Sequence, residues 1–531
     1  MKKQNILKGS IILMISAVVA KGFGAVFKIP LTNLLGGVGM SYFSCAYSLF
    51  LPVYALTVTG LSSAVARMTA QSAALGMYRN IKRIRSTALI IFAAAGLLGS
   101  ALILLLAYPF SVIATGGTEA VLSLMMIAPS VLFGCVTAVE RGYYEGMSNM
   151  YPTAISQAVE GAVKVGIGLW LCGLVSANGS KIMAWFPSVN DIRVLSAAAG
   201  ILGVSISSFG AMAFFAVLAL FGRRRDDGER LVCSRRSIAR ELLITALPVG
   251  VSSVVTNLTS IVDMWTMIAC ISHFGCRTVI PALVADEDIP YFVYGSFAGI
   301  ALTVFNLIPS VTNMLGKSVL PSITSAWAEH NFTALEAGTS QALVTAATIA
   351  VPSAFGLGVL APEVLHLLFP LQSDEVKICI SALRFLMPGM VCLCLSFPVF
   401  SLLQAVGKPS VPLKIMMIGT VLKAVGNLIL IPLVGADGAA ISTSVCYFVI
   451  LILSLAIYVH ITKVSLPFDM LMKTLYAGVM CGGAAYLASD IFSIVISLKV
   501  LSLAFSVGSG AIMYLISIGL LSVRRKKRAT A

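Results

Sequence analysis

The stretch KGSIILMISAVVAKGFGAVFKIPLTNL, residues 8–34, decides the class of fold. It is longer than the roughly 20 apolar residues that an α-helix needs to cross a bilayer, and only Lys21 and Lys28 interrupt its apolar core. Two lysines near the N-terminus and a Val-x-Ala pattern make its first part look like a secretory signal, but the apolar sequence continues beyond Lys21. We therefore interpret it as a first membrane-spanning helix that is not cleaved.

The composition of the whole chain points the same way. Of its 531 residues, 58% are hydrophobic and only 11% are charged, whereas soluble proteins carry roughly 25% charged residues. The chain lacks the polar side chains that would cover a soluble protein, so we predict an integral membrane protein. Its net charge of +15 sits in short connections between apolar runs, which favours a membrane explanation over nucleic-acid binding.

Several classes of function are disfavoured. The eleven cysteines are scattered, and the Cys392-x-Cys394 pair has no histidine or further cysteine at ligand spacing, so we expect no metal and no cofactor. The connections are no longer than about 20 residues, whereas a catalytic domain needs about 50. A membrane-embedded glycosyl- or acyltransferase would also need histidines or paired carboxylates near the membrane surface. We therefore predict that the chain is not an enzyme and that its function is built from the helices.

The apolar runs define the predicted architecture, an all-α integral membrane protein of about fourteen transmembrane helices. The predicted spans lie at 8–34, 38–66, 84–110, 117–140, 152–174, 194–221, 240–272, 291–326, 333–360, 378–404, 410–433, 436–459, 468–489 and 497–522. With the N-terminus inside, the inner segments hold 24 basic residues and the outer loops hold 5. This bias follows the positive-inside rule, so we predict that both termini are cytoplasmic.

An internal repeat predicts two related bundles. Tyr143–Pro152 and the following span with Lys164 resemble Leu403–Pro412 and the following span with Lys423, at offsets of 259 to 260 positions. Transporters are often built from such duplicated bundles. We predict two pseudo-symmetric six-helix bundles plus two C-terminal helices: an N-terminal bundle (1–221), a cytoplasmic basic connection (222–240), a C-terminal bundle (241–460), and two additional helices with a basic tail (461–531).

Seven basic residues lie inside predicted spans, where each costs about 2.5 to 3.5 kcal/mol if it faces lipid. We expect Arg384, early in its span, to reach the membrane interface, and we predict that the other six line a substrate-binding cavity: Lys21, Lys28, Arg67, Lys164, Lys317 and Lys423.

The positions of these residues support that assignment. Lys21 and Lys28 are two helical turns apart and project from one face of the first helix. Lys164 and Lys423 occupy related places in the repeat. Arg67 closes the second span at the inner interface, where membrane anchoring is the alternative role.

Acidic residues inside the spans are fewer. Asp263 lies deep in the seventh span, and we consider both an ion-coupling role and a structural role for it. Glu160 lies one helical turn before Lys164, so pairing between them is the simplest expectation. Glu140 and Arg141 are adjacent and are expected to form a local interface pair.

A cavity with many cations and few acids implies an anionic substrate. Lysine and arginine bind phosphate oxygens well, so a diphosphate headgroup fits this chemistry. A gap open sideways to lipid would let an attached hydrocarbon chain stay in the bilayer.

Specific motifs resemble a known family. The opening Lys8–Leu13 with Lys21–Gly24 and Phe27–Ile29, then Leu35–Met40, then Arg141–Gln157, resemble the stage V sporulation protein B group of polysaccharide transporters. That group belongs to the multidrug, oligosaccharidyl-lipid and polysaccharide exporter superfamily. The resemblance covers essentially the whole chain, and Arg141–Gln157 is its most specific part.

The resemblance implies a fourteen-helix, two-lobed flippase for undecaprenyl-diphosphate-linked sugars. It implies substrate contacts from spans one, two and eight, which map to Lys21, Lys28, Arg67 and Lys317. Relatives commonly have arginine at the first two positions, and lysine keeps the charge but not the bidentate geometry. It also implies a groove for the lipid tail at spans thirteen and fourteen.

We therefore predict a monomeric exporter in the plasma membrane of a bacterium, which moves a lipid II-like cell-wall or polysaccharide precursor from the inner to the outer leaflet. Its predicted partners are this lipid-linked sugar diphosphate, the bilayer and a coupling ion, H+ or Na+, at Asp263, with no nucleic acid. The alternative is an ion-coupled multidrug exporter of the same superfamily, which would need cavity acids to meet cationic drugs.

Overall fold

The computed structural model describes residues 6–184, 189, 191–221, 233–275, 284–495 and 498–529. Every regular element in these residues is a helix, and twelve of the described helices are long and apolar enough to cross a membrane. This confirms the predicted all-α membrane fold, while the number of fourteen spans stays a prediction. Residues 222–232 of the predicted basic connection lie outside the described residues.

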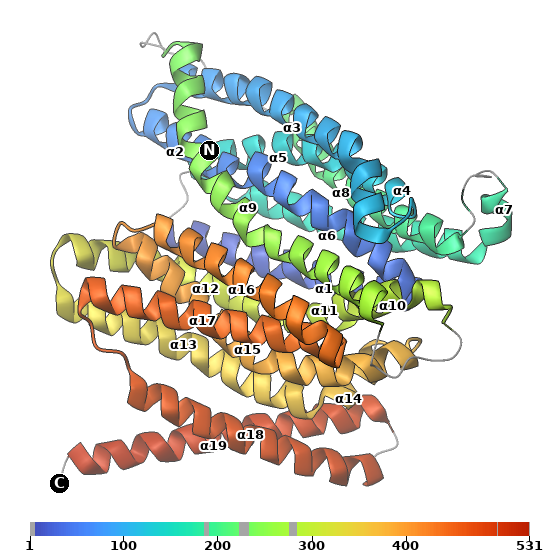
Figure 1. Cartoon of the computed structure of the whole chain (residues 1–531). Coiled ribbons are helices and arrows are strands. Elements are labelled where there is room, and N and C mark those ends of the chain that lie inside the picture. The colour runs from blue at the N-terminus through green and yellow to red at the C-terminus, as the bar shows by residue number, and fades with distance from the viewer. Residues whose placement is uncertain are drawn as a thin grey trace. The chain divides into compact units, whose positions relative to one another are not determined.

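The chain divides into two compact units, residues 1–268 and 269–531. The domain boundaries that we drew at 221, 240 and 460 stay a prediction. Figure 1 shows the helices of both units along the chain. The helices of the first unit are α1 (Ile6–Tyr54), the π-helical segment η1 (Ala55–Thr59), α2 (Gly60–Ala74), α3 (Tyr78–Thr115), α4 (Val121–Ile127), α5 (Pro129–Gly146), α6 (Tyr151–Ala177), α7 (Gly179–Met183), α8 (Ile192–Leu220) and most of α9 (Arg235–Phe274), which continues past the boundary at Ile268.

The break between the first two predicted spans falls at Gly36, inside α1. Its backbone has φ 65° and ψ −175°, a combination that is open to glycine and strained for other residues. The second predicted span continues through η1 and α2 to Ala74. Arg67, expected at the end of that span, therefore lies within α2, about two turns before its end.

The second unit contains α10 (Ile289–Ser296), the π-helical segment η3 (Phe297–Ala301), α11 (Leu302–Phe305), α12 (Leu307–Ala328), α13 (Phe332–Val359), α14 (Ala361–Leu368), α15 (Ser373–Ala405), α16 (Ser410–Val434), α17 (Ala436–Thr462), α18 (Phe468–Val495) and α19 (Lys499–Ala529), after a short 3-10 turn, η2 (Asp286–Asp288). Its core is centred on α15, which packs against α12, α13 and α17.

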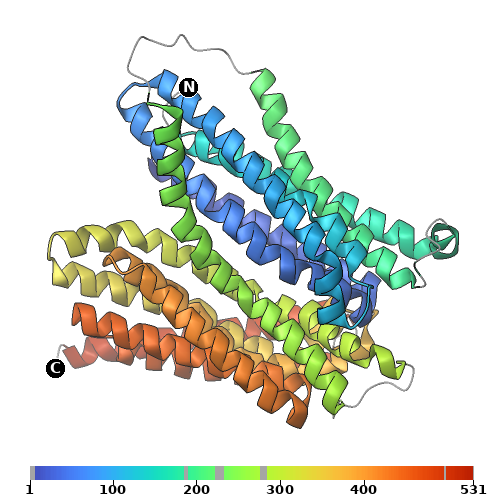
Figure 2. The same cartoon turned by 45° about the horizontal axis from the view of Figure 1, so that its top comes forward.

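The last two helices form a pair that packs on α13. Figures 1 and 2 both show α18 and α19 side by side in red tones. A Cβ on Gly478 of α18 would collide with Val351 of α13 and lie 3.0 Å from the ring of Phe355. The hydroxyl of Tyr514 in α19 donates to the carbonyl of Thr348 at 3.1 Å. The α18 backbone at Gly478 therefore packs directly against side chains of α13, and Tyr514 adds a hydrogen bond from α19.

Two pairs of turns support the internal repeat. Ser148, between α5 and α6, and Gly407, between α15 and α16, are 259 positions apart and both left-handed, with φ of 56° and 77°. In both turns the backbone N–H of the next residue donates to the carbonyl five residues before it: Asn149 to Tyr144, and Lys408 to Leu403, each at 2.9 Å. The α2–α3 and α12–α13 turns repeat this motif at Gly76 and His330. These turns support the predicted pseudo-symmetry of the two bundles.

Candidate functional site

Two of the predicted lysines come together in the first unit. The Nζ of Lys164, in α6, lies over the ring of Phe27 at 5.1 Å and over the ring of Tyr47 at 5.7 Å, both measured to the ring centroid. Lys28 directly follows Phe27 in α1, so it is adjacent in sequence to one of the rings that Lys164 contacts. Both lysines are partly exposed. The predicted pairing of Lys164 with Glu160 is wrong, because Glu160 bonds to another helix and Lys164 packs on aromatic rings instead.

An aromatic series continues from this lysine along α1, and our sequence reasoning missed it. Phe43, Tyr47, Phe50 and Tyr54 contact one another in order, with ring centroids 4.9, 5.8 and 5.0 Å apart. Their alternating spacing of four, three and four residues places them on one helical face, so the signal was present in the sequence. Tyr47 and Tyr54 are partly exposed, whereas the two phenylalanines are buried.

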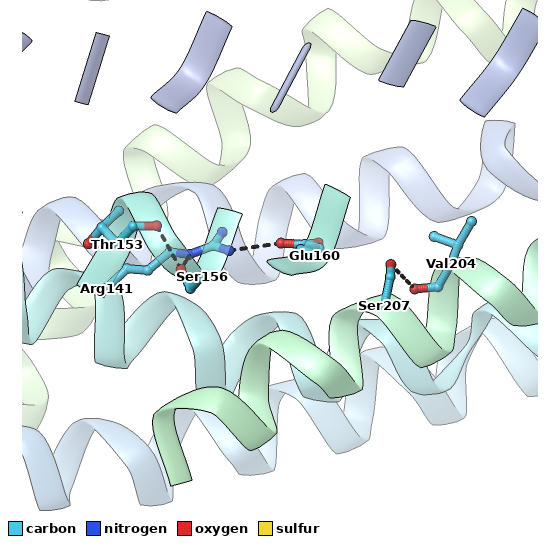
Figure 3. A network of polar contacts seen from close by, with 6 residues as sticks. All are labelled: Arg141, Thr153, Ser156, Glu160, Val204 and Ser207. Atoms are coloured by element: carbon cyan, nitrogen blue, oxygen red, sulfur yellow. Dashed lines mark hydrogen bonds and ion pairs between the residues drawn. The ribbon is translucent and has the colours of Figure 1, made fainter. Parts of the chain in front are cut away.

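Arg141 of α5 is held against α6 by two bonds, which Figure 3 shows from close by. Its Nη2 pairs with Oε2 of Glu160 at 2.8 Å, and its Nε donates to the hydroxyl of Ser156 at 2.9 Å. The Ser156 hydroxyl donates in turn to the carbonyl of Thr153 at 2.8 Å. Because both partners of the guanidinium come from α6, this network fixes α6 to α5.

The neighbouring Glu140 points to a different helix. Its Oε1 accepts from Nε of Arg85, in α3, at 2.9 Å and pairs with Nη2 at 2.8 Å. Glu140 is only 4% exposed, and the Arg85 guanidinium also lies 4.9 Å from the centroid of the Tyr143 ring. The expected local pair of Glu140 with Arg141 is therefore wrong: adjacent residues on α5 bond to two different neighbours, α3 and α6.

The other predicted residues of the first unit differ in exposure. Lys21 is exposed on α1, two turns before Lys28, and Arg67 is exposed on α2. Asp263, in α9, is 4% exposed. The predicted residues of this unit therefore come from four helices, α1, α2, α6 and α9.

The predicted residues of the second unit differ in their surroundings. Lys423, in α16, is only 3% exposed, and its carbonyl accepts from the hydroxyl of Ser442 at 3.0 Å. Arg384 is exposed on α15, and its Nε donates to the carbonyl of Gly358 at 3.2 Å. The side chain of Lys317 lies outside the described residues, although its backbone is part of α12.

The side chains of the cluster in the first unit suit an anion. Glu160 pairs with Arg141, and the ammonium group of Lys164 lies over the rings of Phe27 and Tyr47, with Lys28 next to Phe27 in α1. Ammonium groups bind phosphate oxygens, and tyrosine offers both a ring face and a hydroxyl. Among the described residues, no group of three His, Cys, Asp or Glu side chains is placed to hold a metal ion.

Two family models match the chain. A model described as polysaccharide biosynthesis protein matches residues 6–327. A model described as MatE matches residues 296–429.

Curated relatives match most of the chain at low identity. Lipid II flippase MurJ of Bacillus subtilis (strain 168) is 21% identical over 463 residues, 83% of this chain and 80% of the relative. Stage V sporulation protein B of the same organism is 22% identical over 486 residues, 91% of this chain and 89% of the relative.

Solved structures share the fold. Lipid II flippase MurJ in an inward closed conformation matches with a TM-score of 0.68 at 14% identity, over 97% of this chain and 98% of that chain. An inward-facing multidrug resistance MATE family transporter of the MOP superfamily matches with a TM-score of 0.64 at 16% identity, over 86% of this chain and 98% of that chain.

Proposed function

We propose that this chain, which belongs to the polysaccharide biosynthesis protein family, is a flippase for a polyprenyl-diphosphate-linked precursor of the cell wall or of a polysaccharide. The chain is a multi-pass membrane transporter of the MOP superfamily and not an enzyme. Its relatives in B. subtilis support a bacterial plasma membrane as its location. The proposed direction is from the inner to the outer leaflet, by alternating access.

The observation that carries this proposal is the position of the Lys164 ammonium over the rings of Phe27 and Tyr47, with Lys28 next to Phe27 in α1 and with Tyr47 and Tyr54 partly exposed. A diphosphate supplies the negative charge that these lysines attract, and the ring faces of Tyr47 and Tyr54 suit a sugar. Lys21, Arg67, Lys317 and Lys423 complete the proposed substrate-binding set.

The names of the curated relatives support a lipid-linked substrate. One relative is a lipid II flippase, so lipid II is the first substrate to test. We assign no sporulation role on the strength of the second relative's name, and the sugar is left to the experiment.

A second candidate is an ion-coupled multidrug exporter. The MatE model over residues 296–429 and the similarity to a MATE structure favour it. This function needs acids that meet a cationic drug. The predicted cavity residues are all lysines and arginines, which suit a cationic drug poorly, so we rank it second.

The decisive experiment measures lipid II translocation in proteoliposomes. We expect the double variant Lys28→Ala and Lys164→Ala to lose at least 100-fold in rate, because each of the two lost charge-assisted bonds is worth about 1.5 to 3 kcal/mol. The matched control is Lys377→Ala, since Lys377 forms an exposed 2.8 Å pair with Asp374 at the start of α15, and its rate should be unchanged. Wild-type rates in the double variant, or efflux of cationic drugs without lipid II movement, would refute the flippase proposal.

The proposed ion-coupling role of Asp263 has its own test. The carboxylate is almost fully buried, so Asp263→Asn removes a charge with little change in volume. If an ion drives transport through this group, the variant should lose its response to imposed H+ and Na+ gradients. Transport at the wild-type rate across both gradients would exclude Asp263 as the coupling site.

A further inference from the structure

The second span contains a π-helical segment, η1, at Ala55–Thr59. A π-helical turn holds one residue more than an α-helical turn over the same length, so η1 stores a surplus residue within the span. It begins three residues after Pro52, whose ring nitrogen cannot donate to the preceding turn. The segment joins α1, which carries Lys28 and Tyr47, to α2, which carries Arg67.

Side-chain hydroxyls donate hydrogen bonds to carbonyl oxygens in this segment and just before it. Thr57 Oγ1 donates to the carbonyl of Val53 at 2.9 Å, and Thr59 Oγ1 donates to that of Ala55 at 2.5 Å. The thiol of Cys135, in α5, donates to the carbonyl of Thr57 at 3.6 Å. A π turn weakens the regular hydrogen-bond ladder, and these side chains supply replacement donors.

Two glycines of α5, Gly142 and Gly146, pack against the backbone of α2. A Cβ on Gly142 would collide with the carbonyl oxygen of Ser62, and a Cβ on Gly146 would lie 2.6 Å from that of Ala66. The two glycines are four residues apart, as are their two partners. The contact therefore joins backbone to backbone, and no side chain of α5 is inserted into α2 at these points.

On its other side, the span meets α9 in the same way. A Cβ on Gly250 would lie 2.7 Å from the carbonyl oxygen of Leu56, and a Cβ on Gly60 would collide with that of Ala246. All four residues belong to the first unit. Close packing of small residues is common between membrane helices. Here one contact lies within η1, at Leu56, and the other directly after it, at Gly60.

We propose that η1 is a register switch that positions Arg67. If the surplus residue moves along the span past Arg67, α2 turns by about 100° and shifts by about 1.5 Å, because one residue of an α-helix covers that angle and rise. On the α5 side the stationary helix presents Gly142 and Gly146, which leave room for this motion. On the α9 side Thr59 would take the place of Gly60, and its Cβ would collide with the Ala246 carbonyl, so the switch requires α9 to move away from α2. The switch rests on the proposed flippase function, in which Arg67 is one of the substrate groups.

The switch makes a positional prediction. The exposed residues of α2 are Ser63, Arg67, Ala70, Gln71 and Ala74, while Ala66 is partly exposed. When the surplus residue leaves η1, the preceding residue takes each place, so Ala66 moves to the position of Arg67. A single cysteine at 66, in a cysteine-free background in nanodiscs, should react with a charged thiol reagent at least fivefold faster when lipid II is added, while a cysteine at 67 reacts more slowly.

A deletion tests the stored residue independently. Deleting Leu56, whose side chain is 44% exposed, should convert the π turn to an α turn, leave both flanking helices in place and give a folded protein that transports lipid II at least tenfold more slowly. Deleting Leu61, which is 1% exposed in the regular α2, should prevent folding. A misfolded Leu56 deletion, or one with normal transport, would overturn the switch. Labelling at 66 and 67 that does not respond to lipid II, in single-cysteine variants that still transport lipid II, would also overturn the switch. That result would leave the flippase proposal intact.

Discussion

The junction between α5 and α6 and the junction between α15 and α16 have the same backbone turn but different chemistry. Eight residues before the left-handed Ser148, the first junction has Glu140 and Arg141, which bond to α3 and α6. Eight residues before Gly407, the second has Val399 and Phe400. Val399 is fully buried in an apolar cluster of the second unit.

The two halves of the repeat therefore share the backbone conformation of this turn, while different interactions hold the helices around it in place. Ion pairs join the helices of the first junction, and apolar packing joins those of the second. Lys164 and Lys423 differ in the same sense, because the first is partly exposed over two rings and the second is buried. Related positions in the repeat therefore do not imply related roles.

The largest expected effect comes from breaking the ionic junction. Glu140→Ala leaves Arg85 in a largely buried site without its carboxylate, and we expect a loss of about 3 to 5 kcal/mol in the free energy of unfolding. The measurement is SDS-induced unfolding of the purified protein. The double variant Glu140→Val with Arg85→Leu imitates the apolar junction and should unfold close to wild type, since such replacements are often neutral or stabilising. Equal losses in both variants would show that the ion pair itself is not what matters.

A smaller effect is expected at the ring beneath Lys164. Tyr47→Leu removes one of two cation–π contacts, each worth about 0.5 to 2 kcal/mol, so lipid II transport should fall by about two- to thirtyfold. Tyr47→Phe keeps the ring and should retain most of the rate. If the two variants lose the same activity, the hydroxyl of Tyr47 is the important group and the ring contact is not.

The smallest effect concerns the turns themselves. Ser148 holds φ 56° without being glycine, so Ser148→Gly should raise the stability by about 1 kcal/mol. Gly407→Ala should lower it by a similar amount, because nothing lies within 4 Å of the added Cβ and only the backbone strain remains. Both shifts are measurable by SDS unfolding. Unequal magnitudes would mean that the two turns are not equivalent.

Much of the fold was predictable because apolar length and glycine breaks are local signals. The break that we predicted between spans 8–34 and 38–66 coincides with the non-helical backbone at Gly36, although helix α1 continues on both sides of it. The repeat was visible as spacing between related prolines and lysines, and the two left-handed turns support it.

The partners of the charged residues could not be read in the same way. Glu140 and Arg141 are adjacent in sequence but lie a helical step apart, so they face different neighbours. Which helices those neighbours are depends on packing across the unit. The aromatic face of α1 was predictable from its spacing, whereas the burial of Lys423 depends on the helices that surround α16.

The close contact of α18 with α13 also bears on how the protein is made. Phe468 begins α18, 109 residues after α13 ends at Val359. At about 5 to 20 residues per second, the ribosome needs roughly 5 to 20 s to add that length. During this interval the α13 surface around Val351 and Phe355 must be covered by lipid or by an insertion factor. Assembly of the second unit is therefore completed only when the glycine face of α18 displaces that temporary cover.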